Sequence, residues 1–442
     1  MSKKIGGVVA LVGLCALSLF LLNCGSSSSR PSGVLYVLTQ GSNGVGDNVS
    51  SFAIDLNSGN LSLVNSNATT CLTAASTCGL PVNILLDPTG AVAFVLNQGA
   101  PPCPSCTPAT TGAPTIYSYT VNSDGSLGTP TAATTPALVP GDTAIAMTRD
   151  AGGNFLYVIT EGNQSSNPPL APQLLVFSTK PGSTSLTPVS NVLSTLTRIP
   201  TAISVLTFPA PGSGTTPPCG FTTSEEFLYV TSSTDLSPMH DDNTLSVYCV
   251  DSSGILTDKT PIPPYTPQPV PLSVQAVNTS SAGLSGGGVF VYVGSQTNGS
   301  GSLSAFQMCT QVGSAGCAQQ DVTAALLKPV GTTSTGQNPV AMAVDPTNSF
   351  LYVVCYIQNA VYGYSIGTTG TLTALSTPYQ QTGLQPVALA LHPSVNNTGQ
   401  FLYTSNSGQN NISGFALSTT NGSMSSLPTV VTPAAPSGMA VR

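Results

Sequence analysis

The sequence predicts an all-β protein whose seven four-stranded antiparallel blades close into a ring, a seven-bladed β-propeller. A short apolar triplet around an aromatic residue recurs at intervals of about 50 to 70 residues, which indicates a repeated supersecondary unit. In addition, the last segment of the chain matches the first strand of a repeat. The seven triplets are Leu35-Tyr36-Val37, Ala93-Phe94-Val95, Leu156-Tyr157-Val158, Leu228-Tyr229-Val230, Val291-Tyr292-Val293, Leu351-Tyr352-Val353 and Leu402-Tyr403-Thr404.

The clearest repeat predicts four strands, at residues 339–344, 350–356, 360–366 and 372–375. Turn-forming Asp, Pro, Asn and Gly residues separate these segments. The first two strands are apolar almost throughout, a pattern typical of strands that are buried on both faces. Such units must cover one another, and a closed ring of blades provides that cover.

The two ends of the propeller segment predict how the ring closes. The repeats begin at Val34 with a second strand, whereas residues 436–441 resemble the first strand that starts at Pro386. We therefore expect the C-terminal strand to complete the N-terminal blade. An open solenoid, or two β-sandwiches, would leave this half-repeat unexplained.

The first 24 residues resemble a bacterial lipoprotein signal. Lys3 and Lys4 precede an apolar stretch at residues 5–22, and Cys24 is followed by serines. We expect a signal segment at 1–24 with Cys24 lipidated, a Ser-rich tether at 25–33, and the propeller at 34–442. Asn23 departs from the usual small residue before the cysteine, so an ordinary secretory signal or a retained anchor stay as alternatives. The predicted location is extracytoplasmic, in the cell envelope, with the lipid as the contact with the membrane, or secreted.

The cysteines agree with an oxidising compartment. Close spacing makes four local pairs plausible, although sequence alone does not fix disulfide connectivity. The pairs are Cys71 with Cys78, Cys103 with Cys106, Cys219 with Cys249, and Cys309 with Cys317. Cys103 and Cys106 have a zinc-like spacing, but no second pair completes such a site. Cys355 is left over inside a strand, and we expect a buried, inert thiol.

Composition limits the partners of the chain. Charged residues make up 6% of it, nine Lys and Arg stand against sixteen Asp and Glu, and the net charge is −7. Binding to nucleic acid needs a basic stripe, which this sequence lacks. We expect a monomer whose partner is an envelope component, a glycan or a protein.

Few residues at the expected channel mouth can carry chemistry. Glu161 is a candidate general base, Arg198 a candidate anchor for an anion, and His240 a candidate base or metal ligand beside Asp241 and Asp242. Each also has a structural interpretation: a loop carboxylate that bonds backbone amides, an arginine that clamps carbonyls, and a solvated loop tip. No cofactor is expected other than a divalent cation at Asp241 and Asp242.

The last repeats resemble a known family. Phe350-Leu351-Tyr352-Val353-Val354, then residues 359–366 and Gly370-Thr371-Leu372, are similar to the repeat of the lactonase-type propellers, which include 6-phosphogluconolactonase-like and YVTN-repeat proteins. The resemblance covers residues 34–442 and implies a seven-bladed ring. Enzymatic members carry His and Arg in first-strand segments, whereas residues 141–146 and 199–204 contain neither.

Two functions follow as expectations. The first is a lipid-anchored propeller that binds a ligand without catalysis, in accord with the neutral loops and the missing histidines. The alternative is a lactone hydrolase in which Glu161 or His240 acts as the base and Arg198 as the anchor. The sequence identifies neither the ligand nor the substrate.

Overall fold

A computed structural model gives the fold of the chain. It describes residues 33–41, 48–69, 80–99, 112–132, 138–163, 169–189, 196–208, 219, 225–235, 243–261, 265–279, 287–297, 299–310, 312–313, 316–393 and 399–442. Within these ranges, no helix is long and apolar enough to span a bilayer. The predicted signal segment and Cys24 lie outside the described residues.

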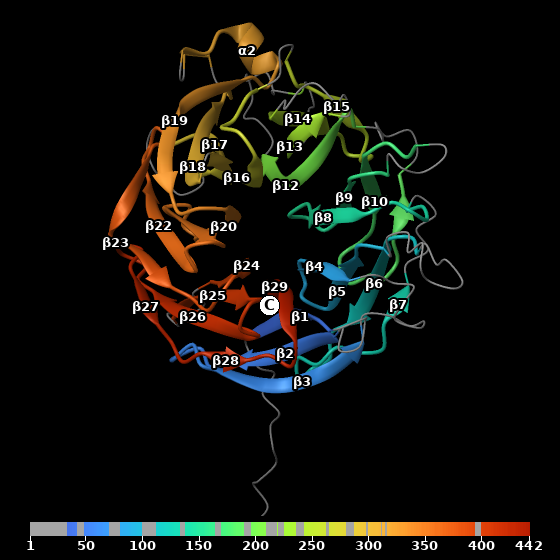
Figure 1. Cartoon of the computed structure of the whole chain (residues 1–442). Coiled ribbons are helices and arrows are strands. Elements are labelled where there is room, and N and C mark those ends of the chain that lie inside the picture. The colour runs from blue at the N-terminus through green and yellow to red at the C-terminus, as the bar shows by residue number, and fades with distance from the viewer. Residues whose placement is uncertain are drawn as a thin grey trace, which may run out of the picture.

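Seven antiparallel sheets stand around a central axis, which confirms the predicted all-β propeller (Figure 1). Each sheet has four strands in order from the axis outwards, and the seventh blade adds a short fifth strand. From blade 1 to blade 7 the strands are β29 (Ala435–Val441), β1 (Val34–Gln40), β2 (Asn48–Ile54), β3 (Leu61–Thr69); β4 (Pro81–Leu86), β5 (Val92–Asn97), β6 (Thr115–Thr120), β7 (Thr131–Ala132); β8 (Ala144–Arg149), β9 (Phe155–Thr160), β10 (Gln173–Ser178), β11 (Thr187–Pro188); β12 (Arg198–Phe208), β13 (Glu225–Asp235), β14 (Thr244–Val250), β15 (Leu256–Asp258); β16 (Pro271–Asn278), β17 (Val289–Thr297), β18 (Ser300–Met308), β19 (Leu327–Thr335); β20 (Pro339–Val344), β21 (Phe350–Cys355), β22 (Ala360–Ile366), β23 (Leu372–Gln381); and β24 (Pro386–His392), β25 (Gln400–Asn406), β26 (Asn411–Leu417), β27 (Met424–Ser426), β28 (Val430–Val431).

The C-terminal strand closes the ring, as the sequence predicts. Strand β29 pairs with β1 in blade 1, so that Tyr36 lies opposite Ala440 and Val37 opposite Met439. Beyond the strand, the Arg442 amide donates to the Val34 carbonyl at 2.9 Å. The two ends of the ring are thus held in one sheet, and the C-terminus lies beside β1 at the inner side of the ring (Figure 1).

The fourth strand of the clearest repeat is longer than predicted. The sequence predicts this strand at residues 372–375, but β23 runs to Gln381 and pairs along β22 as far as Ala360. Most side chains of β23 are exposed, and Thr, Tyr and Gln are among them, so the apolar periodicity that marks inner strands is missing from this outer edge. The backbone of β23 still pairs with β22 over this length, and this pairing extends the strand without an apolar pattern.

The triplet tyrosines of blades 1, 5, 6 and 7 each fasten their blade to the next. Tyr36 donates through its hydroxyl to the Gly125 carbonyl at 2.9 Å, and a glycine with positive φ provides the turn there. Tyr292, Tyr352 and Tyr403 repeat this contact with glycine carbonyls of their neighbouring blades. These tyrosines are fully buried between the sheets, so the recurring triplet is a structural device.

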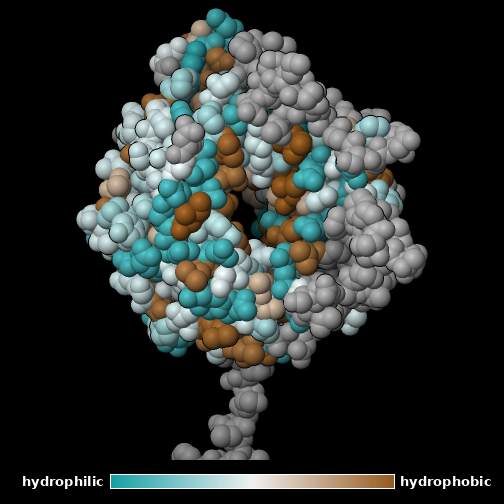
Figure 2. All heavy atoms as spheres, in the orientation of Figure 1, coloured by the Kyte–Doolittle hydropathy of each residue, from teal (hydrophilic) through white to brown (hydrophobic). Residues whose placement is uncertain are grey.

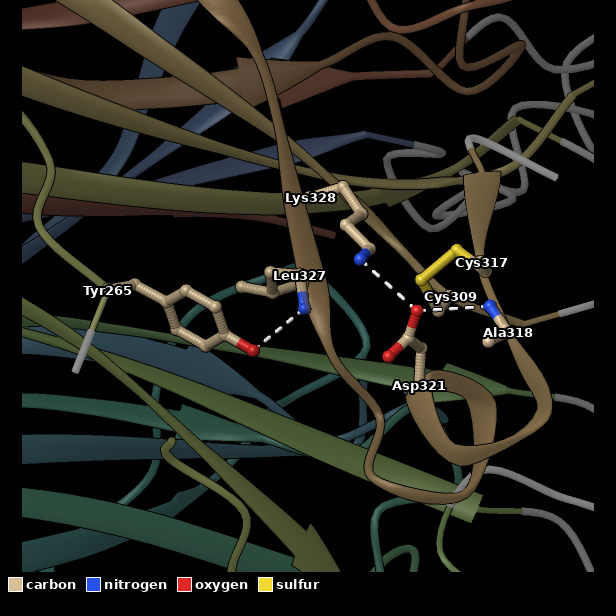
Figure 3. Close-up of polar contacts among 7 residues, drawn as sticks. All are labelled: Tyr265, Cys309, Cys317, Ala318, Asp321, Leu327 and Lys328. Atoms are coloured by element: carbon tan, nitrogen blue, oxygen red, sulfur yellow. Dashed lines mark hydrogen bonds and ion pairs between the residues drawn. A yellow bond between two sulfur atoms is a disulfide. The ribbon is translucent and has the colours of Figure 1, made fainter. Parts of the chain in front are cut away.

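Two of the four expected disulfides lie among the described residues, and both are confirmed: Cys219–Cys249 and Cys309–Cys317. The pairs Cys71 with Cys78 and Cys103 with Cys106 lie outside them. Cys309–Cys317 precedes the short helix α2 (Gln319–Thr323), where Asp321 accepts from the Ala318 amide at 3.0 Å and pairs with Lys328 at 3.1 Å (Figure 3).

The remaining cysteine is a buried thiol, as expected. Cys355 is free and has no exposed surface. Burial raises the pKa of its thiol to about 12, so the nucleophilic thiolate does not form at neutral pH.

Candidate functional site

The innermost strands of the seven blades surround a cavity of about 760 Å³ on the axis of the ring. It opens at the centre of the molecule, where hydrophobic and hydrophilic surfaces alternate around the hole (Figure 2). The wall is formed by residues of β4, β8, β12, β16, β20, β24 and β29. This volume lies within the range of small-molecule sites, about 300–1,000 Å³.

One end of the cavity is framed by a ring of β-bulges. In every blade, the pairing between the innermost strand and its neighbour shifts register near the start of the inner strand. A bulge adds an unpaired residue and redirects its side chain. The added residues in blades 2 to 7 all line the cavity, and we call them the collar: Val82, Ile145, Thr201, Leu272, Val340 and Val387. The collar is uncharged and mainly apolar.

The wall beyond the collar is also neutral, with one exception. Its polar side chains include Ser204, Thr207 and Gln275, and Ser204 accepts from the Ala276 amide of the next blade at 3.1 Å. Arg149, at the end of β8, is the only titratable residue among the described residues that line the cavity. The collar and Arg149 therefore give the channel an apolar end and a cationic end.

Amides at the collar end hold the blades together. Three residues that precede inner-strand prolines have left-handed backbones, with φ between 51° and 55°: Val270, Asn338 and Gln385. The backbone amides of these three residues donate to side-chain oxygens of the preceding blade at 2.7 to 2.8 Å. The acceptors are, in the same order, Asn243, Gln296 and Asn359. These polar side chains are engaged in maintaining a strained backbone, so the structure gives this part of the expected channel mouth a structural role.

Glu161 follows the end of β9, on the same side of the ring as the collar. It lies close to Asp142, whose Oδ1 accepts from the Thr143 and Gly162 amides at 2.7 and 2.9 Å. Burial, and then repulsion from Asp142, raise the pKa of Glu161. Burial likewise raises the pKa of Asp142. Two carboxyl groups with raised pKa values therefore lie at this rim, although neither lines the cavity.

Arg198 begins β12 and lies on this side of the ring too. Its charge acts on Tyr248, in the third strand of the same blade, and Arg198 is not part of the cavity wall. His240, Asp241 and Asp242 lie outside the described residues, so their convergence with Glu161 and Arg198 stays a prediction. In the described part of the chain, no three His, Cys, Asp or Glu side chains gather at a metal-binding distance.

Arg149 is not among the site residues predicted from the sequence, although the repeat contains a signal for it. The corresponding positions at the ends of other inner strands are Leu86, Val344 and Leu391, all apolar. A charged residue at a repeat position that is otherwise apolar marks a local change of role. Aligning the repeats for such departures would have singled out Arg149.

Comparisons with known proteins show the fold. A periplasmic gluconolactonase from Pseudomonas aeruginosa is 15% identical, with a TM-score of 0.59 over 92% of this chain and 98% of that one. A candidate 6-phosphogluconolactonase from Bacteroides fragilis is 13% identical, with a TM-score of 0.58 over 94% and 99%. The chain has the fold of these lactonase-type propellers. No family model and no curated protein sequence matches it.

Proposed function

We propose that this propeller is a non-catalytic binding module of the cell envelope, whose ligand occupies the central channel. The residues of the cavity wall support this proposal. Acid–base catalysis needs a titratable group within about 2.6–3.2 Å of the reacting atoms. Among the described wall residues the only titratable group is Arg149, which stays protonated and can bind or orient but cannot accept a proton.

The proposed location is outside the cytoplasm, with the chain held by a lipid on Cys24. Support comes from Cys219–Cys249 and Cys309–Cys317, because disulfides persist in oxidising compartments. A fold neighbour described as a periplasmic gluconolactonase is in accord with this location. The sparse charge of the chain also suits a neutral or weakly charged ligand.

Blocking the channel tests this proposal. Gln275 lines the cavity, and its side chain bonds only the adjacent Ala276 carbonyl among the described residues. Gln275→Trp adds an indole to the wall and is expected to abolish binding of octanamide, a neutral amphiphilic probe. Val431→Trp places the same indole on an outer strand, where Val431 is 76% exposed, and should leave binding unchanged.

The measurement is equilibrium dialysis of octanamide against the full chain in lipid nanodiscs, with empty nanodiscs as the blank. Saturable binding of one octanamide per chain, lost in Gln275→Trp alone, supports a channel site. No saturable binding, or equal binding by wild type and Gln275→Trp, would overturn it.

Lactone hydrolysis is the second candidate function, and Glu161 favours it. A carboxyl group with a raised pKa at the collar rim has the property expected of a general base. Fold neighbours described as lactonases support the same function. This function requires Arg198 or another cation to reach the same substrate as Glu161, together with an opening from the rim into the channel.

A further inference from the structure

A single cation stands at one end of an otherwise neutral cavity. Arg149 forms the wall there with Ala151 and Thr207. Its Nε donates to the Leu86 carbonyl of the neighbouring blade, and its Nη1 donates to the Asp150 carbonyl at 2.8 Å. Two backbone contacts fix the plane of the guanidinium, and its Nη2 donates to no described residue.

No described carboxylate forms an ion pair with this guanidinium. Burial lowers the pKa of Arg149, and the charges of Asp150 and Asp87 partly oppose this shift. The Asp87 carboxylate already accepts from the Val92 and Gly182 amides at 2.8 and 2.9 Å, as well as from Thr89. Arg149 therefore keeps donors for an anion that enters the channel.

The other end of the cavity suits an apolar group. Ile145 of the collar and Arg149 are four residues apart on β8, a separation of about 13 Å in an extended strand. Between them, the wall includes Met147 and, at the equivalent position of β12, Ile203. A ligand that reaches both ends must be elongated, with an apolar group towards the collar and a negative charge at the other end.

We propose that the channel ligand is an organic monoanion with an apolar body, such as a medium-chain carboxylate. Its charged group pairs with Arg149, and its chain lies towards the collar. This inference rests on the channel site proposed above and adds the chemical class of its ligand. The carboxylate accepts from Nη2 of Arg149, and each buried methylene adds apolar contact with the wall.

Octanoate and octanamide form the matched pair of probes, because they differ in charge and scarcely in shape. We expect the wild-type full chain in nanodiscs to bind octanoate at least tenfold more tightly than octanamide, the gain of one charge-assisted contact. Arg149→Gln should remove this preference, because it weakens the binding of octanoate at least tenfold more than that of octanamide. Arg149→Lys keeps the charge and should retain part of the preference.

Chain length provides an independent readout. Along the series from butanoate to octanoate, affinity should rise about fourfold per methylene. Leu272→Asn in the collar should flatten this rise while Arg149-dependent charge selectivity persists. Free concentrations are measured by dialysis, so partition into the lipid cancels between wild type and variants.

One outcome would overturn this inference and leave the channel site intact. In it, Gln275→Trp blocks octanamide binding, but the wild type shows no preference for octanoate or Arg149→Gln has no effect. Failure of both probes to bind in the channel would overturn the channel site itself. An affinity independent of chain length would contradict the orientation of the apolar body towards the collar.

Discussion

Deletion of residues 435–442 should abolish the cooperative unfolding transition of the chain. These residues form β29, which pairs with β1 and contributes Met439 to the core between blades 1 and 7. Each lost backbone hydrogen bond lowers the free energy of unfolding by about 0.5–1.5 kcal/mol. The loss of the buried Met439 side chain lowers it by about 1.5–3 kcal/mol more. The combined loss is comparable to the whole stability of a typical domain, about 5–15 kcal/mol.

Circular dichroism during thermal unfolding measures this effect. Adding a synthetic peptide of residues 433–442 to the truncated chain should restore a cooperative transition, whereas a scrambled peptide should not. The control variant is Val431→Thr on the outer strand β28, which should unfold as wild type does. An unchanged midpoint for the truncated chain would show that the ring does not depend on β29.

Replacement of Glu226 by Gln should stabilise the protein above neutral pH. In blades 1, 5, 6 and 7 the second-strand tyrosine bonds a glycine carbonyl, but Tyr157 of blade 3 donates to Glu226 Oε2 at 2.7 Å. Burial raises the pKa of Glu226 to about 7, and Asp150 adds repulsion. Tyr157, Asp150 and Thr207 surround this carboxyl, and Arg149 lies next to Asp150 in the sequence.

The direction of the pH effect follows from proton binding. The folded chain holds the Glu226 proton up to about pH 7, whereas an unfolded glutamate loses it near 4.5. Folding is therefore weakened as pH rises between these values, by about 3 kcal/mol in total. Gln keeps a carbonyl acceptor for Tyr157 and has no charge to bury, so Glu226→Gln should lack this loss.

Urea unfolding of wild type and Glu226→Gln at pH 5 and pH 8 measures the difference. The free energies of unfolding should be similar at pH 5 and diverge at pH 8, with the variant more stable. Asp258→Asn, which neutralises an exposed carboxylate on the outer strand β15 of the same blade, is the matched control and should show no such divergence. Parallel pH profiles for wild type and Glu226→Gln would contradict a buried, protonated Glu226.

The sequence predicted the ring because its signals are local and repeated. The aromatic triplets mark the buried second strands, and the half-repeat at residues 436–441 marks the closure of the ring. Two of the expected disulfides, at Cys219 and Cys309, are formed between residues that are close in the chain. Local spacing and apolar patterning contain this information.

The site depends on features that local patterning does not encode. A bulge at Val340 or Ile145 arises from the register between two strands, and the collar forms only when seven such strands face one axis. Arg149 and Glu226 emerge as departures from the repeat, but their neighbours, Leu86 and Tyr157, lie in other parts of the chain. Loop carboxylates such as Glu161 are easy to identify as candidates in a sequence, but the sequence does not indicate whether they line the cavity.

The most direct test of a channel that binds without catalysis is a lactone hydrolysis assay of the full chain. Glucono-δ-lactone and its 6-phosphate are incubated with the protein, and acid release is followed at constant pH against the spontaneous rate. We predict that acid release in the presence of wild type, Glu161→Gln or Arg198→Gln proceeds at the spontaneous rate. Saturable acceleration by wild type that is lost in Glu161→Gln would contradict the account and assign the propeller to catalysis.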